Sequence, residues 1–452
     1  MSINISNLHA VLLQKISSSA NEEDTLVYSK AIAQLNLGIV TSVFTFAELP
    51  TVPDTVGRLY FVESDRALYI YSVQYARWIL LASDIIGLLF TWGRNNYGRL
   101  GDNTTLASKS SPVSVVGGFT NWCQVSAGDI HTAAIRTNGT LWTWGSNSSG
   151  QLGDNTAASS SKSSPVSVVG GFTNWCQVSA GVSHTAAVRT NGTLWTWGFN
   201  AAGQLGDNTA GVGASKSSPV SVVGGFTDWC QVSAGCAYTV ALRTNCTLWT
   251  WGCNNQGQLG DNTIVSKSSP VSVVGGFTDW CQVSTVFRHT AALRTNGTLW
   301  AWGYNGSAQL GDNTIVAKSS PVSVVGGFTD WCQVSAGSFH TAAVRTNGTL
   351  WAWGTNILGT LGDNTVGNKS SPVSVVGGFT DWCQVSAGDF HSAAIRTNGT
   401  LWSWGRNNNY GQLGDNTIVN KSSPISVVGG FTDWCRVSAG TTFTAALRIK
   451  TF

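Results

Sequence analysis

Short runs in which apolar and polar residues alternate recur along most of the chain and predict β-strands. One such run, Thr-Leu-Trp-Thr-Trp, begins at Thr140, and its two tryptophans fall on one face while Leu141 and Thr143 fall on the other. Trp-Cys-Gln-Val-Ser and His-Thr-Ala-Ala-Ile-Arg are two further strand-like runs, and the Asn-Gly pair that follows predicts a tight hairpin. Both faces of these strands carry apolar residues, so each small sheet must be covered on both sides.

These strands belong to a sequence unit that is repeated seven times. Trp-Gly recurs at intervals of 51 to 54 residues, and Leu-Gly-Asp-Asn-Thr, Lys-Ser-Ser-Pro and Gly-Gly-Phe-Thr-(Asn/Asp)-Trp-Cys each occur seven times. Small sheets that bury both faces can do so by stacking radially. We therefore predict a mainly β fold, a seven-bladed β-propeller, over residues 86–452. The Trp-Gly tryptophans are Trp92, Trp144, Trp197, Trp251, Trp302, Trp353 and Trp404.

The order of the strands predicts how the ring closes. The chain contains seven segments like Val-Ser-Ala-Gly, but only six full copies of Asn-(Gly/Cys)-Thr-Leu-Trp follow them. Residues 86–92, Ile-Gly-Leu-Leu-Phe-Thr-Trp, fit the missing strand. We expect the last blade to pair residues near 86–92 with the C-terminal strands, which leaves no exposed sheet edge.

The repeated sequence resembles a known family. The run Ala-Gly-x-x-His-Thr-Ala-Ala-(Leu/Ile/Val)-Arg-Thr-Asn-Gly-Thr-Leu-Trp-x-Trp-Gly-x-Asn-x-x-Gly-Gln-Leu-Gly-Asp-Asn is similar to the regulator-of-chromosome-condensation repeat. This resemblance implies a seven-bladed propeller, in agreement with the count of repeats. It implies little about activity, because the fold carries exchange factors, photoreceptors and inhibitors alike. The photoreceptors carry Gly-Trp-Arg-His-Thr runs, whereas this chain has no tryptophan at the matching positions, such as Asp129 and Ile130.

Residues 1–85 lie outside the repeats and form two predicted segments. Apolar residues at near-helical spacing predict a helical segment over 1–38 for oligomerisation or docking, and strand-like runs predict a small β-meander over 39–85. The meander resembles a module near the attachment ends of bacteriophage tail-fibre and other virion proteins, which implies a trimer. A cap on the propeller is the alternative. The expected oligomerisation residues are Ile5, Leu8, Leu12, Ile16, Val27, Ile32 and Leu35.

Composition narrows the class of protein. Hydrophobic residues make up 42% of the chain and charged residues only 10%, which excludes intrinsic disorder. The net charge of +3 is spread evenly, so the basic patch typical of nucleic-acid binding is missing. No apolar stretch is long enough to insert into a membrane, and the first residues lack the pattern of a signal peptide.

The histidines and acidic residues are predicted to be structural. Five histidines share one repeat position, and Tyr238 and Phe443 fill it in the other two units, which favours packing over metal binding. Each Asp-Asn pair supplies one carboxylate, whereas Ca²⁺ takes about six to eight oxygens, so these pairs are interpreted as turns. The histidines are His131, His184, His289, His340 and His391.

The cysteines and the absence of catalytic motifs lead to the same conclusion. Seven of the ten cysteines follow the blade tryptophan, and no Cys-x-x-Cys zinc spacing occurs, so we expect them to be reduced. A local disulfide between two of Cys236, Cys246 and Cys253 stays open. No nucleophile elbow, phosphate loop or paired-carboxylate motif occurs. The chain is therefore expected to be no enzyme and to need no metal or cofactor.

Comparison of the seven units isolates three windows that vary: the residues after Trp-Gly, the linkers after Asp-Asn-Thr, and the pair before each histidine. Fixed strands with varied loops are typical of a recognition surface, and neutral drift is the alternative. Aromatic and arginine side chains dominate binding hot spots. The candidate binding residues are Arg94, Asn96, Tyr97, Phe199, Asn254, Tyr304, Arg406 and Tyr410.

These features favour a non-enzymatic virion protein, a tail fibre or host-recognition appendage, made in the host cytoplasm. Its expected partners are other virion proteins, a host-surface receptor and copies of itself, with a trimer favoured. The alternative is a cytosolic protein–protein interaction scaffold. An exchange factor for a small GTPase is a more distant alternative, because blades that are close to copies of one another offer no single asymmetric interface.

Overall fold

The computed structural model describes the backbone of residues 40–43, 59–62, 67–72, 77–82, 87–156 and 160–449, and side chains from residue 87 onward. The chain divides into two compact units, Met1–Ile86 with Lys450–Phe452, and Gly87–Ile449. The predicted helical segment 1–38 and its apolar residues lie outside the described residues. No helix in the described part of the chain is long and apolar enough to cross a membrane.

The first unit contains one four-stranded sheet. Its strands follow the order of the sequence, with β1 parallel to β2 and the other pairs antiparallel. They are β1 (Val40–Val43), β2 (Leu59–Val62), β3 (Ala67–Ser72) and β4 (Arg77–Ala82).

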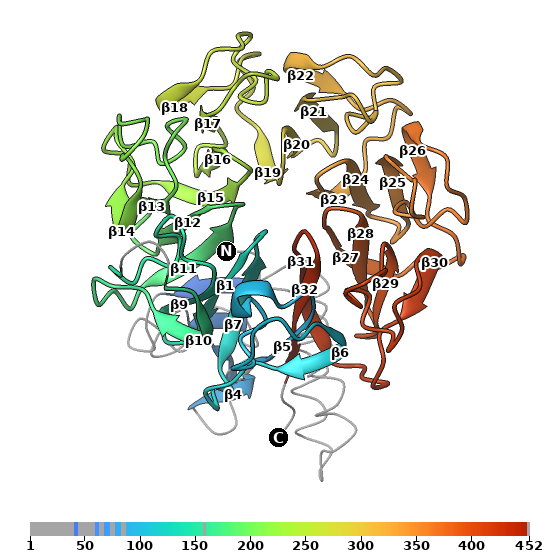
Figure 1. The fold of residues 1–452 in the computed structure, drawn as a ribbon, viewed down its shortest axis with the longest axis horizontal. Helices are drawn as coiled ribbons and strands as arrows, with labels where there is room; N and C mark the ends of the chain where they lie inside the picture. Colours follow the sequence, from blue (N-terminus) through green and yellow to red (C-terminus); the bar gives the residue numbers. More distant parts are fainter. Residues whose placement is uncertain are drawn as a thin grey trace. The chain divides into compact units, whose positions relative to one another are not determined.

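The second unit consists of seven four-stranded antiparallel blades arranged in a ring (Figure 1). This confirms a mainly β fold built from repeated sheets. Blade 1 holds β7 (Trp122–Ala127), β8 (His131–Arg136), β9 (Leu141–Gly145) and β10 (Lys162–Ser167). Blade 2 holds β11 (Trp175–Ala180), β12 (His184–Arg189), β13 (Leu194–Gly198) and β14 (Lys216–Ser221). Blade 3 holds β15 (Trp229–Ala234), β16 (Tyr238–Arg243), β17 (Leu248–Gly252) and β18 (Lys267–Ser272). Blade 4 holds β19 (Trp280–Thr285), β20 (His289–Arg294), β21 (Leu299–Gly303) and β22 (Lys318–Ser323). Blade 5 holds β23 (Trp331–Ala336), β24 (His340–Arg345), β25 (Leu350–Gly354) and β26 (Lys369–Ser374). Blade 6 holds β27 (Trp382–Ala387), β28 (His391–Arg396), β29 (Leu401–Gly405) and β30 (Lys421–Ser426).

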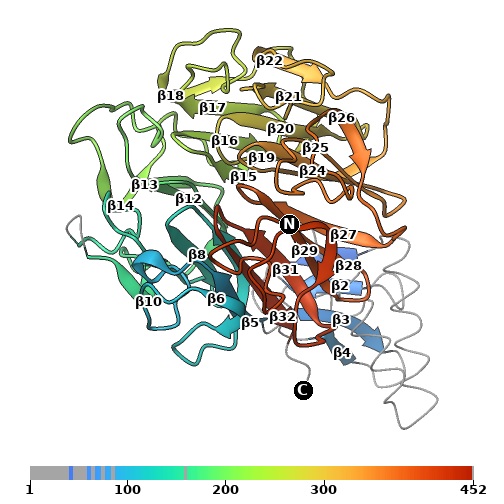
Figure 2. The ribbon, with the colours of Figure 1, turned by 45° about the vertical axis from the view of Figure 1, so that its right-hand side comes forward.

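Blade 7 combines strands from both ends of the repeat region. It holds β31 (Trp434–Ala439) and β32 (Phe443–Ile449) followed by β5 (Gly87–Gly93) and β6 (Lys109–Ser114), and a 3-10 turn, η2 (Asn96–Gly98), follows β5. β32 and β5 pair antiparallel over their whole length, from Phe443 opposite Gly93 to Ile449 opposite Gly87. Figure 2 shows β5 and β6 beside β31 and β32, although more than 300 residues separate them in the sequence.

The hydrophobic core lies between the blades. Seven clusters of buried residues are found in the described part of the chain, one between each pair of neighbouring blades. Between blades 2 and 3, Trp251 is fully buried and packs with Trp229 and Leu194. Gly206 has a φ of +65°, and a Cβ there would lie 2.6 Å from Nε1 of Trp251. The repeated Leu-Gly therefore keeps glycine because the tryptophan of the next blade packs against it.

The ring has two faces that differ in sequence. On one face, hairpins join the second and third strands of blades 1 to 6, with Asn-Gly in five of them and Asn-Cys in blade 3, and they lie beside the connections between blades. In blade 2, Gly192 donates to the Arg189 carbonyl and Thr190 to that of Asn174. Almost the same residues occur there in every unit, so we call it the repeated face. The opposite face carries the turn between the first and second strands and the loop between the third and fourth. All three varied windows fall in these turns and loops, so we call it the varied face.

Candidate functional site

Neighbouring blades are joined by a hydrogen-bonded relay beneath the varied face. Between blades 1 and 2, Nε2 of His131 lies 2.8 Å from Oγ1 of Thr185, whose hydroxyl donates to the carbonyl of Gln151. Because the only hydroxyl hydrogen of Thr185 is used in that bond, His131 donates from Nε2 and its Nδ1 carries no hydrogen. The indole of Trp197 donates to the same carbonyl at 3.0 Å. The relay ties the core tryptophan of one blade to the loop of its neighbour.

The histidine side chains of this relay are structural. All five are fully buried, and the Nδ1 atom of each has no hydrogen-bond partner among the described residues. Burial lowers the pKa of His131, His289, His340 and His391 from 6.5 to about 3, and that of His184 to about 4. The packing interpretation is confirmed, since each ring is enclosed in the core and is bonded through Nε2 to a hydroxyl of the next blade. Tyr238 takes the position in blade 3 and bonds to Thr285 through its hydroxyl.

The Asp-Asn-Thr segments build the loops of the varied face. In blade 2, Asn200 donates to Asp207 at 3.1 Å and accepts from the backbone of Leu205, while Asp207 accepts from both the backbone and the hydroxyl of Thr209. The turn-forming interpretation of the aspartates is confirmed. Asn254 makes the same bonds in blade 3 and is fully buried. Its selection as a binding residue is wrong, because its side chain is used inside the loop and does not reach the surface.

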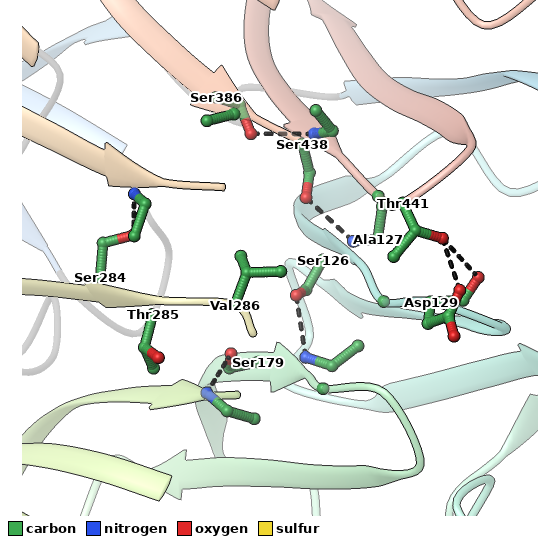
Figure 3. Close-up of a pocket in the computed structure, with 18 of the residues that line it drawn as sticks. Ser126, Ala127, Asp129, Ser179, Ser284, Thr285, Val286, Ser386, Ser438 and Thr441 are labelled. Carbon is green, nitrogen blue, oxygen red and sulfur yellow. Dashed lines mark hydrogen bonds between the residues drawn. The ribbon is translucent and has the colours of Figure 1, made fainter. Parts of the chain in front are cut away.

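Side chains from the preceding blade satisfy the free N–H groups of each first strand, which faces the axis of the ring. At the junction of blades 1 and 2, Ser126 accepts from the N–H of Ala180 at 2.9 Å and Gln124 from that of Val178 at 3.0 Å. Figure 3 shows several of these serine bonds around an axial cavity of about 150 Å³. The serine bond recurs at all seven junctions, with the acceptors Ser126, Ser179, Ser233, Ser284, Ser335, Ser386 and Ser438.

Two of the varied windows are in direct contact on the varied face. The residue after Trp-Gly donates its backbone N–H to the residue before each histidine, or before its equivalent, in the same blade. Examples are Phe199 to the carbonyl of Ser183 at 2.9 Å and Tyr304 to that of Arg288 at 2.8 Å. The third window is joined to the first, since the backbone of Leu106 donates to the Asn95 carbonyl at 3.1 Å. Windows that are separate in the sequence therefore form one surface in each blade.

The remaining candidate residues lie on this surface to different degrees. Tyr97 is 50% exposed and Phe199 is 38% exposed, so both side chains are accessible. The others are half-buried; they are Arg94, Asn96, Tyr304, Arg406 and Tyr410. The structure brings Arg94 and Arg406 together around Tyr410, with guanidinium carbons 4.9 and 5.9 Å from the ring centroid. Tyr97, Phe199 and Tyr304 belong to blades 7, 2 and 4, so they do not form one cluster.

The junction of blades 7 and 1 carries an arginine that occurs at its repeat position in no other unit. Arg99 stands where five units have glutamine, and it is only 2% exposed. It donates to the carbonyls of Asp129 at 2.6 Å and Asn96 at 3.0 Å, and Thr441 donates to the Asp129 carboxylate. Burial lowers the pKa of Arg99 to about 10, so it stays charged at neutral pH. Sequence reasoning missed this cluster, although an arginine replacing a repeated glutamine was a signal that could have found it.

A second unusual group, Asp389, lies next to Phe390 in the first turn of blade 6. Burial raises the pKa of this carboxyl from 3.8 to about 6, the negative charge of Asp129 adds to the effect, and a hydrogen bond from Ser338 and the charge of Arg406 oppose it. Sequence analysis did not single out Asp389. Asp129 holds the same repeat position in blade 1, and the nearby charge of Arg406 distinguishes Asp389.

The cysteines and the acidic residues offer no further chemistry in the described residues. Cys236, Cys246 and Cys253 are thiols, so the local disulfide among them is not formed. Within residues 87–156 and 160–449, no group of three or more His, Cys, Asp or Glu side chains could hold a metal ion. The distinctive chemistry of this part of the chain is therefore the charged and aromatic surface of the varied face.

Comparison with known protein families identifies the propeller. The model of the RCC1-like domain matches residues 170–451, and that of the Regulator of chromosome condensation (RCC1) repeat matches residues 87–135 and 138–188. The chain belongs to the RCC1-like domain family. The resemblance to chromosome-condensation repeats is thus confirmed, whereas the matches begin at residue 87 and the tail-fibre resemblance of residues 39–85 is not supported.

Individual relatives of this RCC1-like protein include an ultraviolet-B receptor of Arabidopsis thaliana, UVR8, 31% identical over 61% of this chain and 62% of the receptor. The Regulator of chromosome condensation of Drosophila melanogaster is 26% identical over 76% of this chain and 64% of its own length. The chain spans only 31% of human HERC6, a probable E3 ubiquitin-protein ligase, at 29% identity. These relatives are longer than the region that matches.

Solved structures share the fold of this RCC1-like protein. Human WBSCR16 has a TM-score of 0.73 and 21% identity, covering 80% of this chain and all of that one. Prp20p of Saccharomyces cerevisiae has a TM-score of 0.72 and 20% identity, covering 81% of this chain and 92% of that one. At this level of identity the likeness concerns the fold alone.

The expected virion function is wrong. The relatives of this RCC1-like protein are cellular proteins of plants, animals and yeast, among them regulators of chromosome condensation. The expected location in a virion, and virion proteins or a host-surface receptor as partners, are wrong for the same reason. The favoured trimer rested on the tail-fibre resemblance and is withdrawn with it. The repeats cover most of the chain and show the family, whereas residues 39–85 lie outside the matched regions.

Proposed function

We propose that this protein is a non-enzymatic protein–protein interaction module that binds a cellular protein partner on its varied face. The observation that carries the proposal is the distribution of variation: the three windows that differ between units all lie on one face, while the repeated face is nearly invariant within the same chain. Loops on a rigid scaffold commonly carry binding residues. The same scaffold supports different surfaces in different blades.

The hydrogen bonds of the scaffold explain how the varied face can change without loss of the fold. The relay from His131 to Gln151 and the serine bonds use repeated residues beneath or beside the windows. The residue after Trp-Gly makes the contact with the turn before the histidine through its backbone N–H, as Phe199 does. Its side chain is therefore free to differ from blade to blade, and selection for a partner can act on it.

The relatives support the class of function. The solved structure of Prp20p is described together with its binding to Gsp1p and histones, which is a property of that protein. We infer the same general role, binding of proteins by a propeller, for this chain. The E3 ligases among the relatives are much longer than the matched region, so their enzymatic activity gives no reason to assign catalysis here.

We also infer that the pairing of β32 with β5 closes the ring in solution. It is supported by two bonds that join the ends of the repeat region: Trp92 donates to the Gln412 carbonyl at 2.9 Å, and Ala127 donates to Ser438 at 2.9 Å. A core cluster containing Leu89, Trp122 and Leu447 lies at the same junction. Closure would hold the varied face rigid across blades 6, 7 and 1.

Site-specific photocrosslinking tests the proposed function. A photoreactive phenylalanine analogue replaces Tyr97 or Phe199 on the varied face, or the exposed Asn191 of a repeated-face hairpin as the matched control. Each full-length variant is irradiated in an extract of the cells that make the protein. We expect a protein adduct at Tyr97 or Phe199 that is missing at Asn191. The same adduct at all three positions, or an adduct at Asn191 alone, would contradict the proposal.

A further inference from the structure

Blades 4 to 7 carry a continuous strip of aromatic and arginine side chains on the varied face. Phe287 contacts Phe339 at a centroid distance of 5.5 Å, and Phe339 stacks on Phe390 at 5.1 Å with an interplanar angle of 22°. Arg288 lies over Phe287 at 4.9 Å at one end of this row. At the other end, Arg406 donates its backbone N–H to the Phe390 carbonyl at 2.7 Å. The row of rings thus reaches the pair of arginines around Tyr410.

The arginines of this strip differ from five arginines of the repeated face. On the repeated face, Arg243, Arg294, Arg345, Arg396 and Arg448 each pair with an aspartate at 2.7 to 2.8 Å. In contrast, Arg94, Arg288 and Arg406 make no ion pair with any described residue. The buried Nε atom of Arg94 also has no hydrogen-bond partner in the described part of the chain. Three arginines at the two ends of the strip are therefore not paired with a carboxylate of the described residues.

The surroundings of the strip do not neutralise these charges. Asp129 is engaged by Thr441 at the junction of blades 7 and 1, where Arg99 adds a further positive charge through its bond to the Asp129 carbonyl. Asp389 directly precedes Phe390, and its carboxyl interacts with the charge of Arg406. Counting Arg94, Arg99, Arg288 and Arg406 against Asp129 and Asp389 gives four positive and two negative charges.

We propose that this strip, formed by Arg288, Phe287, Phe339, Phe390, Arg406, Tyr410 and Arg94, binds an acidic segment of the partner protein that carries aromatic side chains among its carboxylates. The inference rests on the proposed function and names the chemistry of the partner. Carboxylates suit the arginines because each pair forms charge-assisted hydrogen bonds. Aromatic side chains suit the row of rings, since aromatic pairs gain from offset or edge contacts beyond the area they bury. Because the strip has arginines at both ends and aromatic rings between them, the partner segment needs both carboxylates and aromatic side chains.

Peptide binding to the full-length chain tests the inference. Three labelled peptides share two tryptophans and differ at the other positions, which are Asp and Glu in the first, Lys in the second, and Asn and Gln in the third. Fluorescence anisotropy at low and moderate salt measures the affinity. We expect the acidic peptide to bind at least about tenfold more tightly than the other two and to weaken as salt screens the charges.

Arginine variants show whether the strip is the site that binds the acidic peptide. Arg94→Gln combined with Arg406→Gln should weaken the acidic peptide at least about tenfold, and Arg288→Gln at the other end should weaken it on its own. Arg189→Gln is the matched control, because this arginine lies on the repeated face and bonds to Asn174, so its removal leaves no carboxylate unpaired. Thermal unfolding of each variant excludes loss of the fold, and the Arg288 variant provides the test if the double variant does not fold.

Each of three results would overturn the inference. These are equal binding of all three peptides, unchanged binding to the arginine variants, and equally tight binding of a single-stranded oligonucleotide of the same net charge. None of these three results would contradict the proposed function if a protein adduct were found at Tyr97 or Phe199. An adduct at Asn191 alone would instead remove the proposed function, whatever the peptides do.

Discussion

The buried histidines couple the stability of the propeller to pH. In the unfolded chain each titrates near pH 6.5, whereas burial lowers its pKa in the folded protein to about 3 or 4. Between these values the unfolded chain binds more protons, so the free energy of unfolding decreases as the pH falls. The neutral histidines contribute fully to the free energy of unfolding above about pH 6.5. Below about pH 6.5, each histidine lowers this free energy by up to about 1.4 kcal/mol per pH unit.

Urea unfolding between pH 7.5 and 5, followed by tryptophan fluorescence, measures this dependence. We expect the unfolding midpoint to fall steadily below about pH 6.5. His391→Phe should show a shallower dependence, because phenylalanine occupies the same position as Phe443 in blade 7 and cannot take up a proton. A midpoint that does not change with pH down to 5 would mean that the histidines are accessible and titrate normally.

Single residues also show where sequence reasoning succeeded and failed. The structural role of the histidines could be predicted from Tyr238 and Phe443, which occupy the same repeat position. Neither side chain could take the place of an imidazole that binds a metal. Asn254 was misassigned although every unit has an asparagine there, which already indicated a bond within the loop. The unpaired charge of Arg94 could not be predicted, because it depends on which side chains of other blades come near.

At the scale of the strands, six of the seven first strands bond through their free N–H groups to a serine and a glutamine of the preceding blade. The serine bond is present at all seven junctions, but the glutamine bond is not. At the junction of blades 7 and 1, Arg436 stands at the glutamine position, and the N–H of Val125 has no bond to it. Among the strands described, this junction is therefore the one that has the serine bond but lacks the glutamine bond.

Arg436→Gln should supply the missing glutamine bond to the N–H of Val125. A net gain of about 0.5 to 1.5 kcal/mol in the free energy of unfolding is expected from one further hydrogen bond to the backbone. Chemical denaturation of the variant and the parent measures the difference. Gln384→Ala is the converse change, which removes the bond to Val437 at 3.1 Å and should destabilise the protein. Loss of stability in Arg436→Gln would show that the arginine stabilises this junction in another way.

At the scale of the whole propeller, much of the architecture could be predicted and the binding strip could not. The repeats give the number of blades, the identity of each strand and the position of each hairpin. Phe287, Phe339 and Phe390, by contrast, are 52 and 51 residues apart, and Phe287 is the first of its pair whereas the other two are second. Only the folded ring brings them into one row, because neighbouring blades place these turns side by side.

The pairing of β32 with β5 should decide whether the propeller unfolds as one unit. Deleting residues 445–452 removes most of β32 and leaves one side of β5 unpaired. It also exposes Leu89 and Trp122, which are buried in the core cluster of this junction. We expect a broad, early unfolding transition in place of a cooperative one. Deleting residues 450–452 alone is the matched control, and a melting curve for the longer deletion equal to that of the full chain would contradict closure.

The most direct test of the account exchanges varied windows while leaving the scaffold intact. Replacing residues 94–97 and 199–202 with Ser-Asn-Ser-Ser, the sequence of residues 146–149, keeps the buried asparagine of each loop. Cys246→Gly, which restores the repeated hairpin sequence on the other face, is the control. We predict that the exchanged protein melts like its parent but binds the crosslinked partner at least about tenfold less tightly, while the control binds it normally. Unchanged binding by a folded exchanged protein would contradict the claim that the varied face recognises the partner.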